Sequence, residues 1–321
     1  MRFFQSSITT AIVYELRKIM PSIKVNVLRS FRTEGPETLR LLKSGYVQTQ
    51  DHILDSGVWA LTQGTLKHKS NVKIYGKFLK SEASKFRFYM NFDEVFKDEG
   101  MEAFDDKAIA TNLKNQKYLE SQGLNPVPVI HTLEDDEIDY YVSVKQAKGY
   151  EYIAIGSTQA KVQKERKRLI AAVNKLYHAG YKVHIFGVGS YRNLTGLKAW
   201  SCDSSSFAQW ASCGRVIFLS DIISPSPDDI LNGITKKEVT FSFLSHDMNG
   251  KPVDDFIEDH KHQQSILHEY KKKILDPLGF TVNQLFSDEM SRMIANCYYY
   301  TLLEKVLTDD QVKAGVTFNE W

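Results

Sequence analysis

The sequence predicts an α/β protein built as a (β/α)8 barrel, and two observations favour this fold. Short apolar runs alternate along the chain with longer amphipathic stretches, which is typical of parallel strands joined by helices. Eight such runs are present, which is the number of strands in the barrel. An open, doubly wound sheet would show the same alternation, and periodicity does not separate the two folds.

The predicted strands are short and separated by helical patterns. In chain order they are KVNVLRS (24–30), HILD (52–55), FRFYMNF (86–92), PVPVIH (126–131), YIAIG (152–156), KVHIFGVG (182–189), KAWSCD (198–203) and RVIFLS (215–220). The clearest predicted helix spans Gln159 to Ala179, where apolar residues recur at helical spacing before Gly180 ends it. Two more helices are predicted over 36–45 and 136–149.

After residue 221 the pattern becomes helical. No flexible linker precedes this part, so we expect residues 222–321 to supply closing helices that pack on the barrel. The whole chain, 1–321, is then a single domain.

Composition is that of a globular protein in a reducing compartment. The chain is 42% hydrophobic and 25% charged, and its three cysteines show neither a disulfide framework nor the spacing of a metal site. The first residues, MRFFQSSITTAIVYELRK, are too short and too charged for a signal peptide or a membrane span. These observations predict a cytoplasmic protein without a membrane partner.

Several predicted strands end in residues that an apolar core would not choose: Asp55, Asp93 with Glu94, His131, Gly156 with Ser157, and Asp203. In a barrel these strand ends emerge on one face, so we expect the side chains to converge. A single Asp after a strand is commonly a helix N-cap. Several carboxylates together repel one another unless they share a task or a cation. Two separated carboxylates suit chemistry at an anomeric carbon, where one attacks the sugar and the other handles protons.

The order of these motifs resembles the guanine (queuine) transglycosylases, which exchange guanine for a 7-deazaguanine in nucleic acid. The motifs are ILDSG, FDE, AIG, FGVG and an Asp-Ser pair at the next strand end, within about Asp51 to Phe207. Members of this family are barrels, so the resemblance implies the fold that the strand pattern predicts.

The resemblance implies two catalytic carboxylates. Asp55 in ILDSG sits where the family places an acid-base aspartate, and Asp203 in CDSSSF resembles its nucleophile. A gapless alignment would place Ser206 at the nucleophile position instead. We favour Asp203, because a serine attacking a ribosyl carbon would need a base partner that the sequence does not supply.

The resemblance also implies a pocket for the base. Asp93 matches an aspartate that reads the N–H donors of guanine, His131 falls where the family usually carries a glutamine, and Phe186 stands where an apolar side chain stacks on the base. The other positions that it assigns to the pocket are Ser56, Gly156, Ser157 and Gly187. Gly156 and Ser157 replace a pair of glycines whose backbone approaches the heterocycle.

One departure from the family concerns zinc. The tRNA-modifying members hold zinc with three closely spaced cysteines and a histidine, and that spacing does not occur here. His260, His262 and His268 lie in a charged helical stretch where a solvated face explains them better. The departure puts the usual tRNA-docking and dimer surface in doubt, although a homodimer stays open. The chain resembles the DNA-modifying branch found in phages and in bacterial modification clusters.

The resemblance therefore implies a DNA-guanine transglycosylase of a bacterial or phage-infected cell. Its partners would be DNA, or alternatively tRNA, and a free 7-deazaguanine such as 7-cyano-7-deazaguanine. It would need no cofactor, because the energy of the glycosidic bond is conserved in the exchange. Three other functions stay open: a tRNA-guanine transglycosylase without zinc, a barrel that binds nucleic acid without turnover, and a glycoside or nucleoside hydrolase.

A basic stretch could meet the phosphates of a nucleic acid. The net charge is only +2, so a polyanion must be met by a local patch. The candidates are Lys161, Lys164 and Arg168 in the run KVQKERKRL, together with Arg192 after GVG. Lys and Arg on a helix are also common on ordinary solvated surfaces.

Overall fold

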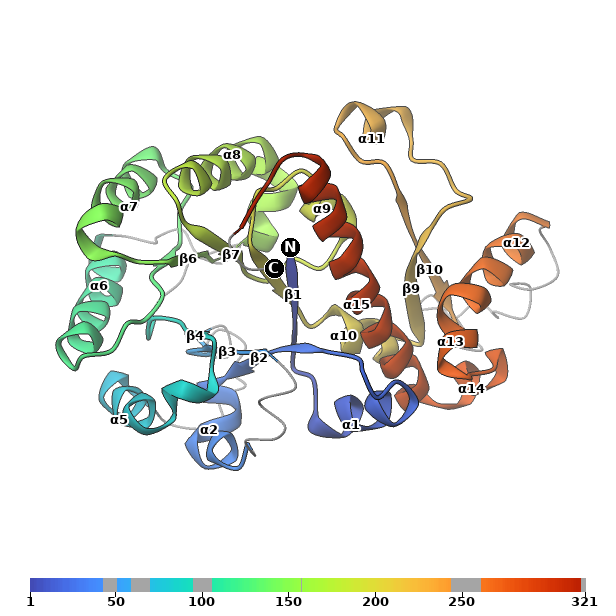
Figure 1. Ribbon diagram of the computed structural model, residues 1–321, viewed down its shortest axis with the longest axis horizontal. Helices are drawn as coiled ribbons and strands as arrows, with labels where there is room; N and C mark the ends of the chain where they lie inside the picture. The colour runs from blue at the N-terminus through green and yellow to red at the C-terminus, as the bar shows by residue number, and fades with distance from the viewer. Residues whose placement is uncertain (43–50, 59–69, 95–105, 157, 244–260, 319–321) are drawn as a thin grey trace.

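The computed structural model describes residues 1–42, 51–58, 70–94, 106–156, 158–243 and 261–318. Its centre is an eight-stranded parallel sheet with the order β4-β3-β2-β1-β8-β7-β6-β5 (Figure 1). The strands are β1 (Arg2–Ser6), β2 (Asn26–Ser30), β3 (His52–Asp55), β4 (Phe88–Tyr89), β5 (Val129–Ile130), β6 (Tyr152–Ile155), β7 (Lys182–Ile185) and β8 (Ser201–Ser204).

The two edge strands of this sheet are joined by one parallel bridge, between Met90 and Val127. The backbone N–H of Asn91 donates to the Val127 carbonyl at 2.8 Å, and the Val127 N–H donates to the Tyr89 carbonyl at 2.8 Å. This bridge completes the circle of strands, so the fold is a (β/α)8 barrel, as the sequence predicts.

Helices follow the strands and form the outer layer (Figure 1). They are α1 (Thr10–Ile19), α2 (Phe31–Arg40), α5 (Val72–Glu82), α6 (Asp106–Ser121), α7 (Asp135–Lys148), α8 (Thr158–His178), α9 (Tyr191–Leu194) and α10 (Ser206–Ser212), with a 3-10 turn, η1 (Ala83–Lys85), after α5. Asn71 caps α5 through its side chain, and Gly149 ends α7 in the left-handed conformation.

The sequence prediction of the strands was wrong at two places. The segment Arg2–Ser6, which the sequence did not predict as a strand, is β1 and lies between β2 and β8. The predicted eighth strand, 215–220, lies outside the barrel. It is β9 (Arg215–Ser220) and pairs antiparallel with β10 (Lys237–Ser242). The count of eight was right because one error compensated for the other.

Buried side chains fill the barrel interior below its mouth. They come from almost every strand: Phe4, Leu28, Ile53, Phe88, Met90, Val127, Ala154 and Trp200. A separate, larger core lies between the strands and the outer helices. Because side chains alternate along a strand, Ser6, Asp55 and Gly156, which come two positions after Phe4, Ile53 and Ala154, also face the interior, but closer to the mouth.

The C-terminal part adds a strand hairpin and further helices. Its helical elements are α11 (Pro227–Leu231), α12 (Lys261–Tyr270), the π-helical turn η3 (Lys271–Leu275), α13 (Asp276–Leu278), α14 (Val282–Ser287) and α15 (Glu289–Lys313). Helix α15 packs against the barrel: Glu304 accepts from the Phe3 N–H at 2.8 Å and from Asn26 Nδ2 at 2.7 Å. Among the described residues, no helix is long and apolar enough to cross a membrane.

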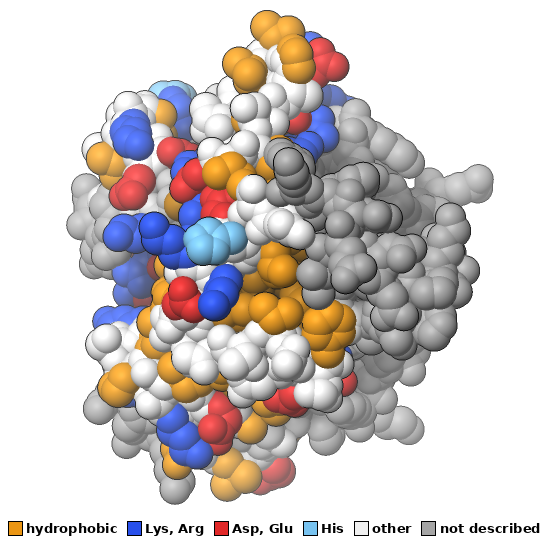
Figure 2. All heavy atoms as spheres, turned by 90° about the vertical axis from the view of Figure 1, so that its right-hand side faces the viewer, with side chains coloured by type: hydrophobic (Ala, Val, Ile, Leu, Met, Phe, Trp, Pro, Cys, Tyr) orange, Lys and Arg blue, Asp and Glu red, His pale blue; other side chains and the backbone are white. Residues whose placement is uncertain are grey.

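The hairpin side of the molecule carries exposed apolar side chains. Ile230 and Leu231 of α11 are 61% and 85% exposed. Figure 2 shows this side, with hydrophobic side chains projecting at its upper tip. Isolated apolar side chains on a surface are common and by themselves indicate no partner.

Candidate active site

Polar side chains from several strands gather at the carboxyl ends of the barrel strands. Asp55 is the last residue of β3, Asp93 and His131 follow β4 and β5, and Asp203 lies in β8. The carboxylates of Asp203 and Asp93 both help to raise the pKa of Asp55. The three acids that the sequence predicted to converge therefore lie within electrostatic reach of one another.

Asp203 is held on both carboxylate oxygens. Ser6 Oγ, from the end of β1, donates to Oδ2 at 2.5 Å, and the Gly187 N–H donates to Oδ1 at 3.1 Å. His184 Nε2 lies 3.4 Å from Oδ1. Only 8% of the Asp203 side chain is exposed. The contacts fix the orientation of the carboxylate, and a small part of the side chain stays exposed.

The Asp-Ser-Gly sequence at the end of β3 places Asp55 and turns the chain. Asp55 Oδ2 accepts the Gly57 N–H at 2.8 Å, which turns the chain directly after the strand. Gly57 has a φ of +84°, and a Cβ there would lie 2.6 Å from Ser30 Oγ. Only glycine fits this position without strain. The motif therefore positions the carboxylate and turns the backbone in two residues.

The pKa of Asp55 is raised to about 6. Burial is the main cause, because it disfavours the charged carboxylate. Asp203 and Asp93 add to the effect, whereas the Gly57 N–H and the Arg32 guanidinium oppose it. A carboxyl group that titrates near neutral pH can both release and accept a proton during turnover.

Asp93 and His131 form a buried pair. His131 Nε2 lies 2.8 Å from Asp93 Oδ2, and Asn91 Nδ2 donates to Asp93 Oδ1 at 2.6 Å. Gly156 borders this pair, since a Cβ on it would lie 3.2 Å from His131 Nδ1. The position that a side chain on residue 156 would take is thus bordered by the His131 ring.

Sequence reasoning missed Arg32, which follows β2. Its guanidinium lies 3.9 Å from the centroid of the Phe92 ring, and Nη1 donates to the Asp93 carbonyl at 2.8 Å. Burial lowers the pKa of Arg32, and the negative charges of Asp55 and Asp93 oppose that effect. Arg32 is the buried cation among these acids, and the polar run SFRTEG after β2 could have indicated it.

The other predicted pocket residues are placed less uniformly. Ser56 is buried, and its carbonyl accepts the Arg32 N–H at 3.3 Å. The Phe186 ring stands perpendicular to the His184 ring at 4.8 Å and packs on the barrel core. Ser157 lies outside the described residues.

Ser206, the alternative nucleophile, occupies a different environment from Asp203. It is the first residue of α10, and its Oγ lies 2.6 Å from Ser204 Oγ. A side-chain hydrogen bond also links it to Tyr300 of α15. These partners draw the hydroxyl toward the outer helices, which supports the preference for Asp203.

The predicted basic patch is partly neutralised by acids. Arg168 contacts Glu165 at 3.2 Å and Glu134 at 3.1 Å, and Arg192 lies 3.3 Å from Asp229. The side chains of Lys161 and Lys164 lie outside the described residues. Arg168 and Arg192 therefore form surface ion pairs with these acids, and only their exposed N–H groups could still meet a phosphate.

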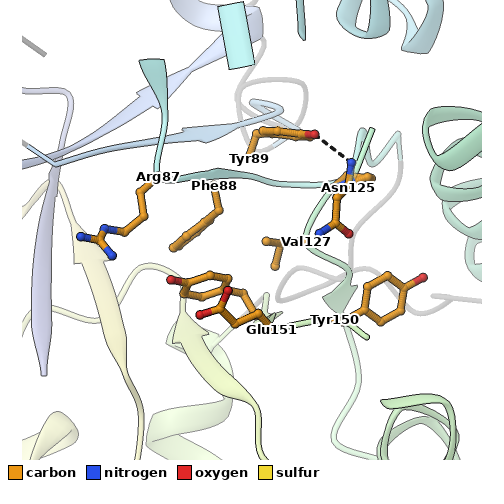
Figure 3. Close-up of a pocket in the computed structure, with 9 residues that line it drawn as sticks. Arg87, Phe88, Tyr89, Asn125, Val127, Tyr150 and Glu151 are labelled. Atoms are coloured by element: carbon orange, nitrogen blue, oxygen red, sulfur yellow. Dashed lines mark hydrogen bonds between the residues drawn. The ribbon is translucent and has the colours of Figure 1, made fainter. Parts of the chain in front are cut away.

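A hollow of about 200 Å³ lies at the opposite end of the barrel from these acids (Figure 3). It is lined by residues that precede or begin β4, β5 and β6, among them Phe88, Val127 and Tyr150. Arg87 extends away from Val127 and Tyr150 in Figure 3 and contacts Asp51 at 3.2 Å. The amino-terminal end of a barrel usually serves stability, so we do not assign chemistry to this hollow.

Within the described part of the chain, no group of three or more His, Cys, Asp or Glu side chains could hold a metal ion. His268 is exposed on α12, whereas the side chains of His260 and His262 lie outside the described residues. Cys202, Cys213 and Cys297 are free thiols.

Comparison with known proteins gives only distant likenesses. No protein-family model and no curated protein matches the chain. Solved structures that resemble it include "QR15, an Aldolase" (TM-score 0.39, 10% identity, 63% of this chain and 89% of that one). Another is the YdjI aldolase from Escherichia coli K12 (TM-score 0.44, 8% identity, 95% of this chain and 89% of that one). A third is the carboxyl transferase domain of Rhizobium etli pyruvate carboxylase (TM-score 0.39, 10% identity, 98% of this chain and 54% of that one). At these TM-scores the likenesses carry no argument about activity.

Proposed function

We propose that this chain is a DNA-guanine transglycosylase, which exchanges guanine in DNA for a 7-deazaguanine through a covalent link to Asp203. One observation carries the proposal: Asp55 and Asp203 lie at the same barrel mouth, and burial, with a smaller contribution from the charge of Asp203, raises the pKa of Asp55. One acid is thereby suited to proton transfer, while the other is oriented by donors on both of its oxygens. This division of labour is what displacement at a sugar carbon requires.

The first half of the reaction removes guanine. A target base leaves the helical stack and enters the mouth, as base-modifying enzymes require. An oxygen of Asp203 attacks C1′ of the deoxyribose, the bond from C1′ to guanine breaks, and protonated Asp55 gives its proton to the departing base. The products are free guanine, an aspartyl ester of the DNA and an Asp55 carboxylate.

The second half reverses these roles with a different base. The ring N–H of the incoming 7-deazaguanine passes its proton to the Asp55 carboxylate, and the nitrogen attacks C1′. The ester bond breaks and Asp203 returns as a carboxylate. Neither a net redox change nor hydrolysis of a triphosphate is involved. Asp203, Asp55 and the two bases account for every bond and proton in the exchange.

Asp93 is the residue proposed to recognise the base. A carboxylate has about four lone-pair sites, so Asp93 can keep its contacts with Asn91 and His131 and still accept N–H groups from the guanine edge. Arg32 contributes indirectly, because its donation to the Asp93 carbonyl fixes the backbone at this position.

Exchange of labelled guanine tests the function directly. Purified protein is incubated with labelled guanine and either duplex DNA or tRNA, and label is counted in the recovered nucleic acid. Incorporation into DNA supports the proposal, whereas incorporation only into tRNA assigns the tRNA activity instead. Release of guanine without incorporation identifies a hydrolase, and binding with neither result identifies a non-catalytic barrel.

The nucleophile is tested by trapping the ester. Asp203→Asn should form no covalent protein–DNA complex, while Asp139→Asn, which removes an exposed acid of α7, should form it at the normal level. An ester that still forms in Asp203→Asn contradicts the assignment.

A further inference from the structure

His184 is a buried polar side chain that the proposed reaction leaves without a role. It is fully buried inside the barrel. The centroid of its ring lies 6.2 Å from that of Phe4 and 6.0 Å from that of Phe88, in edge-to-face contact with both. A polar group in such surroundings costs free energy unless its nitrogens find partners. Both ring nitrogens face polar atoms of the neighbouring strand β8.

The two partners of His184 lie on the same face of β8. Nδ1 is 2.8 Å from Ser201 Oγ, and Nε2 is 3.4 Å from Asp203 Oδ1. Ser201 and Asp203 are two residues apart, so both side chains point into the barrel. The imidazole therefore bridges a hydroxyl below it and the proposed nucleophile above it.

The proton on the imidazole has one arrangement that suits an ionised Asp203. If Nδ1–H donated to Ser201, the lone pair of Nε2 would face the carboxylate and repel it. If the Ser201 hydroxyl donates to Nδ1, then Nε2 carries the proton and directs it at Asp203 Oδ1. The second arrangement gives Ser201 and Nδ1 a hydrogen bond and places the protonated Nε2 3.4 Å from the Asp203 carboxylate, which is an electrostatic contact without hydrogen-bond geometry.

We propose that Ser201, His184 and Asp203 form a relay in which Ser201 fixes the Nε2–H tautomer of His184, and the Nε2–H of His184 positions the Asp203 carboxylate for attack. His184 is a positioning residue, because it acts on the sugar only through Asp203. This role rests on the proposed function, whereas the tautomer itself does not.

Few charged groups compete for this imidazole among the described residues. From β8 the facing acid is Asp203, and from β3 the Asp55 carboxylate reaches the same mouth. Toward the other end, Arg2, Arg87 and Lys182 lie over the Trp200 ring, 5.5 to 6.0 Å from its centroid. From β1 and β4 the ring meets only Phe4 and Phe88.

The tautomer is measured on the free protein by ¹⁵N NMR of ¹⁵N-histidine-labelled chain, with His184→Gln used to assign the signal. The expected spectrum at neutral pH shows an acceptor-type Nδ1 and a protonated Nε2. In Ser201→Ala this preference should be lost or weakened. A protonated Nδ1 in the unmodified chain, whether in the neutral or the doubly protonated ring, overturns the relay whatever the protein's activity.

The effect on the nucleophile is measured by the rate of covalent complex formation with guanine-containing duplex DNA. Losing this 3.4 Å electrostatic contact should slow the step roughly 2- to 10-fold in His184→Phe. His184→Gln, which keeps an N–H donor, should recover part of the rate.

Ser220→Ala is the matched control for Ser201→Ala, because Ser220 is also a buried strand serine but lies on β9 outside the barrel. It should change neither the histidine spectrum nor the rate of covalent complex formation. An unchanged rate in His184→Phe, together with normal thermal stability, contradicts the positioning role. The predicted tautomer could be found while neither the unmodified chain nor any variant forms a covalent complex. That result would contradict the proposed function and leave the tautomer assignment standing.

Discussion

Ser6 Oγ donates a 2.5 Å hydrogen bond to Asp203 Oδ2, although the two residues are 197 positions apart in the chain. Ser6 ends β1 and Asp203 lies in β8, and these strands are neighbours in the barrel. The contact exists because the N-terminal segment of the chain is a barrel strand. It links the strand that the sequence did not predict to the side chain that it assigned as nucleophile.

Removing this hydroxyl should weaken the nucleophile without unfolding the protein. In Ser6→Ala, Asp203 loses its closest donor, and we expect covalent complex formation to slow by roughly 10- to 100-fold. Ser212→Ala, which changes a serine on α10 that bonds only locally to the Gln209 carbonyl, is the control and should leave the rate unchanged. Equal rates in Ser6→Ala and the unmodified chain would show that Ser6 does not assist Asp203.

The raised pKa of Asp55 predicts that folding stability falls as pH rises. Its pKa moves from 3.8 in the unfolded chain to about 6 in the fold, so between these values the folded state binds more protons. Folding therefore favours the protonated acid, and its benefit is lost as pH rises through this window. The shift corresponds to at most about 3 kcal/mol, since one pKa unit is about 1.4 kcal/mol, and partial exposure of Asp55 reduces it.

Asp55→Asn tests this reasoning through urea unfolding at pH 5 and pH 7. The amide cannot ionise but can still accept from Gly57, so we expect the variant to be more stable than the parent at pH 7 by about 1–3 kcal/mol. The difference should be smaller at pH 5, and covalent complex formation should be lost or severely slowed. The stability gain of Asp55→Asn over the parent should be larger at pH 7 than at pH 5. A gain that is smaller at pH 7 would contradict the raised pKa of Asp55.

The strand-end acids could be predicted from sequence, whereas their supporting residues could not. Asp55, Asp93, His131 and Asp203 each follow an apolar run, so the geometry of a parallel barrel already assigns them to one face. The polar run SFRTEG could have marked Arg32 as unusual, but nothing local to Arg32 or Ser6 shows which acid each of them faces. Their roles depend on which strands are neighbours.

The N-terminal strand escaped prediction for a similar reason. RFFQS contains Arg2 and Gln5, whose Nη1 and Nε2 groups find acceptors only in the fold, on Asp51 and on the Cys297 carbonyl. The misassigned run 215–220 is more apolar than β1, yet it packs on α15 through Asn296, whose Oδ1 accepts the Ile217 N–H at 3.1 Å. Hydrophobicity identified strands but did not determine which sheet they join.

Gly156 should be required for the Asp93–His131 pair. An alanine there would place Cβ 3.2 Å from His131 Nδ1 and 3.3 Å from Val129 Cγ1, so the imidazole would have to move. We expect Gly156→Ala to raise the KM for guanine several-fold in the exchange assay. Gly76→Ala in α5 is the control, because its Cβ would meet Leu119 at a similar 3.3 Å but far from the mouth. A raised KM in both variants would point to general disturbance rather than to His131.

Gly57 should be the least replaceable glycine of the mouth. Gly57→Ala combines a φ of +84° with a Cβ only 2.6 Å from Ser30 Oγ and 2.9 Å from Arg32 Cβ. Gly123→Ala shares the positive φ, +76°, but has open space around its Cβ. Placing alanine at a positive φ lowers the free energy of unfolding by on the order of 1–2 kcal/mol. The close contacts of the added Cβ at Gly57 lower it by about 1–3 kcal/mol more.

Urea unfolding of the two alanine variants separates these contributions. Gly57→Ala should be less stable than Gly123→Ala by about 1–3 kcal/mol, which is the overlap with Ser30 and Arg32. Adding Ser30→Ala to Gly57→Ala removes the nearest atom, so it should restore part of the loss. Equal stabilities for the two single variants would mean that the chain after β3 relaxes freely, and that the Asp-Ser-Gly turn does not hold Asp55 in place.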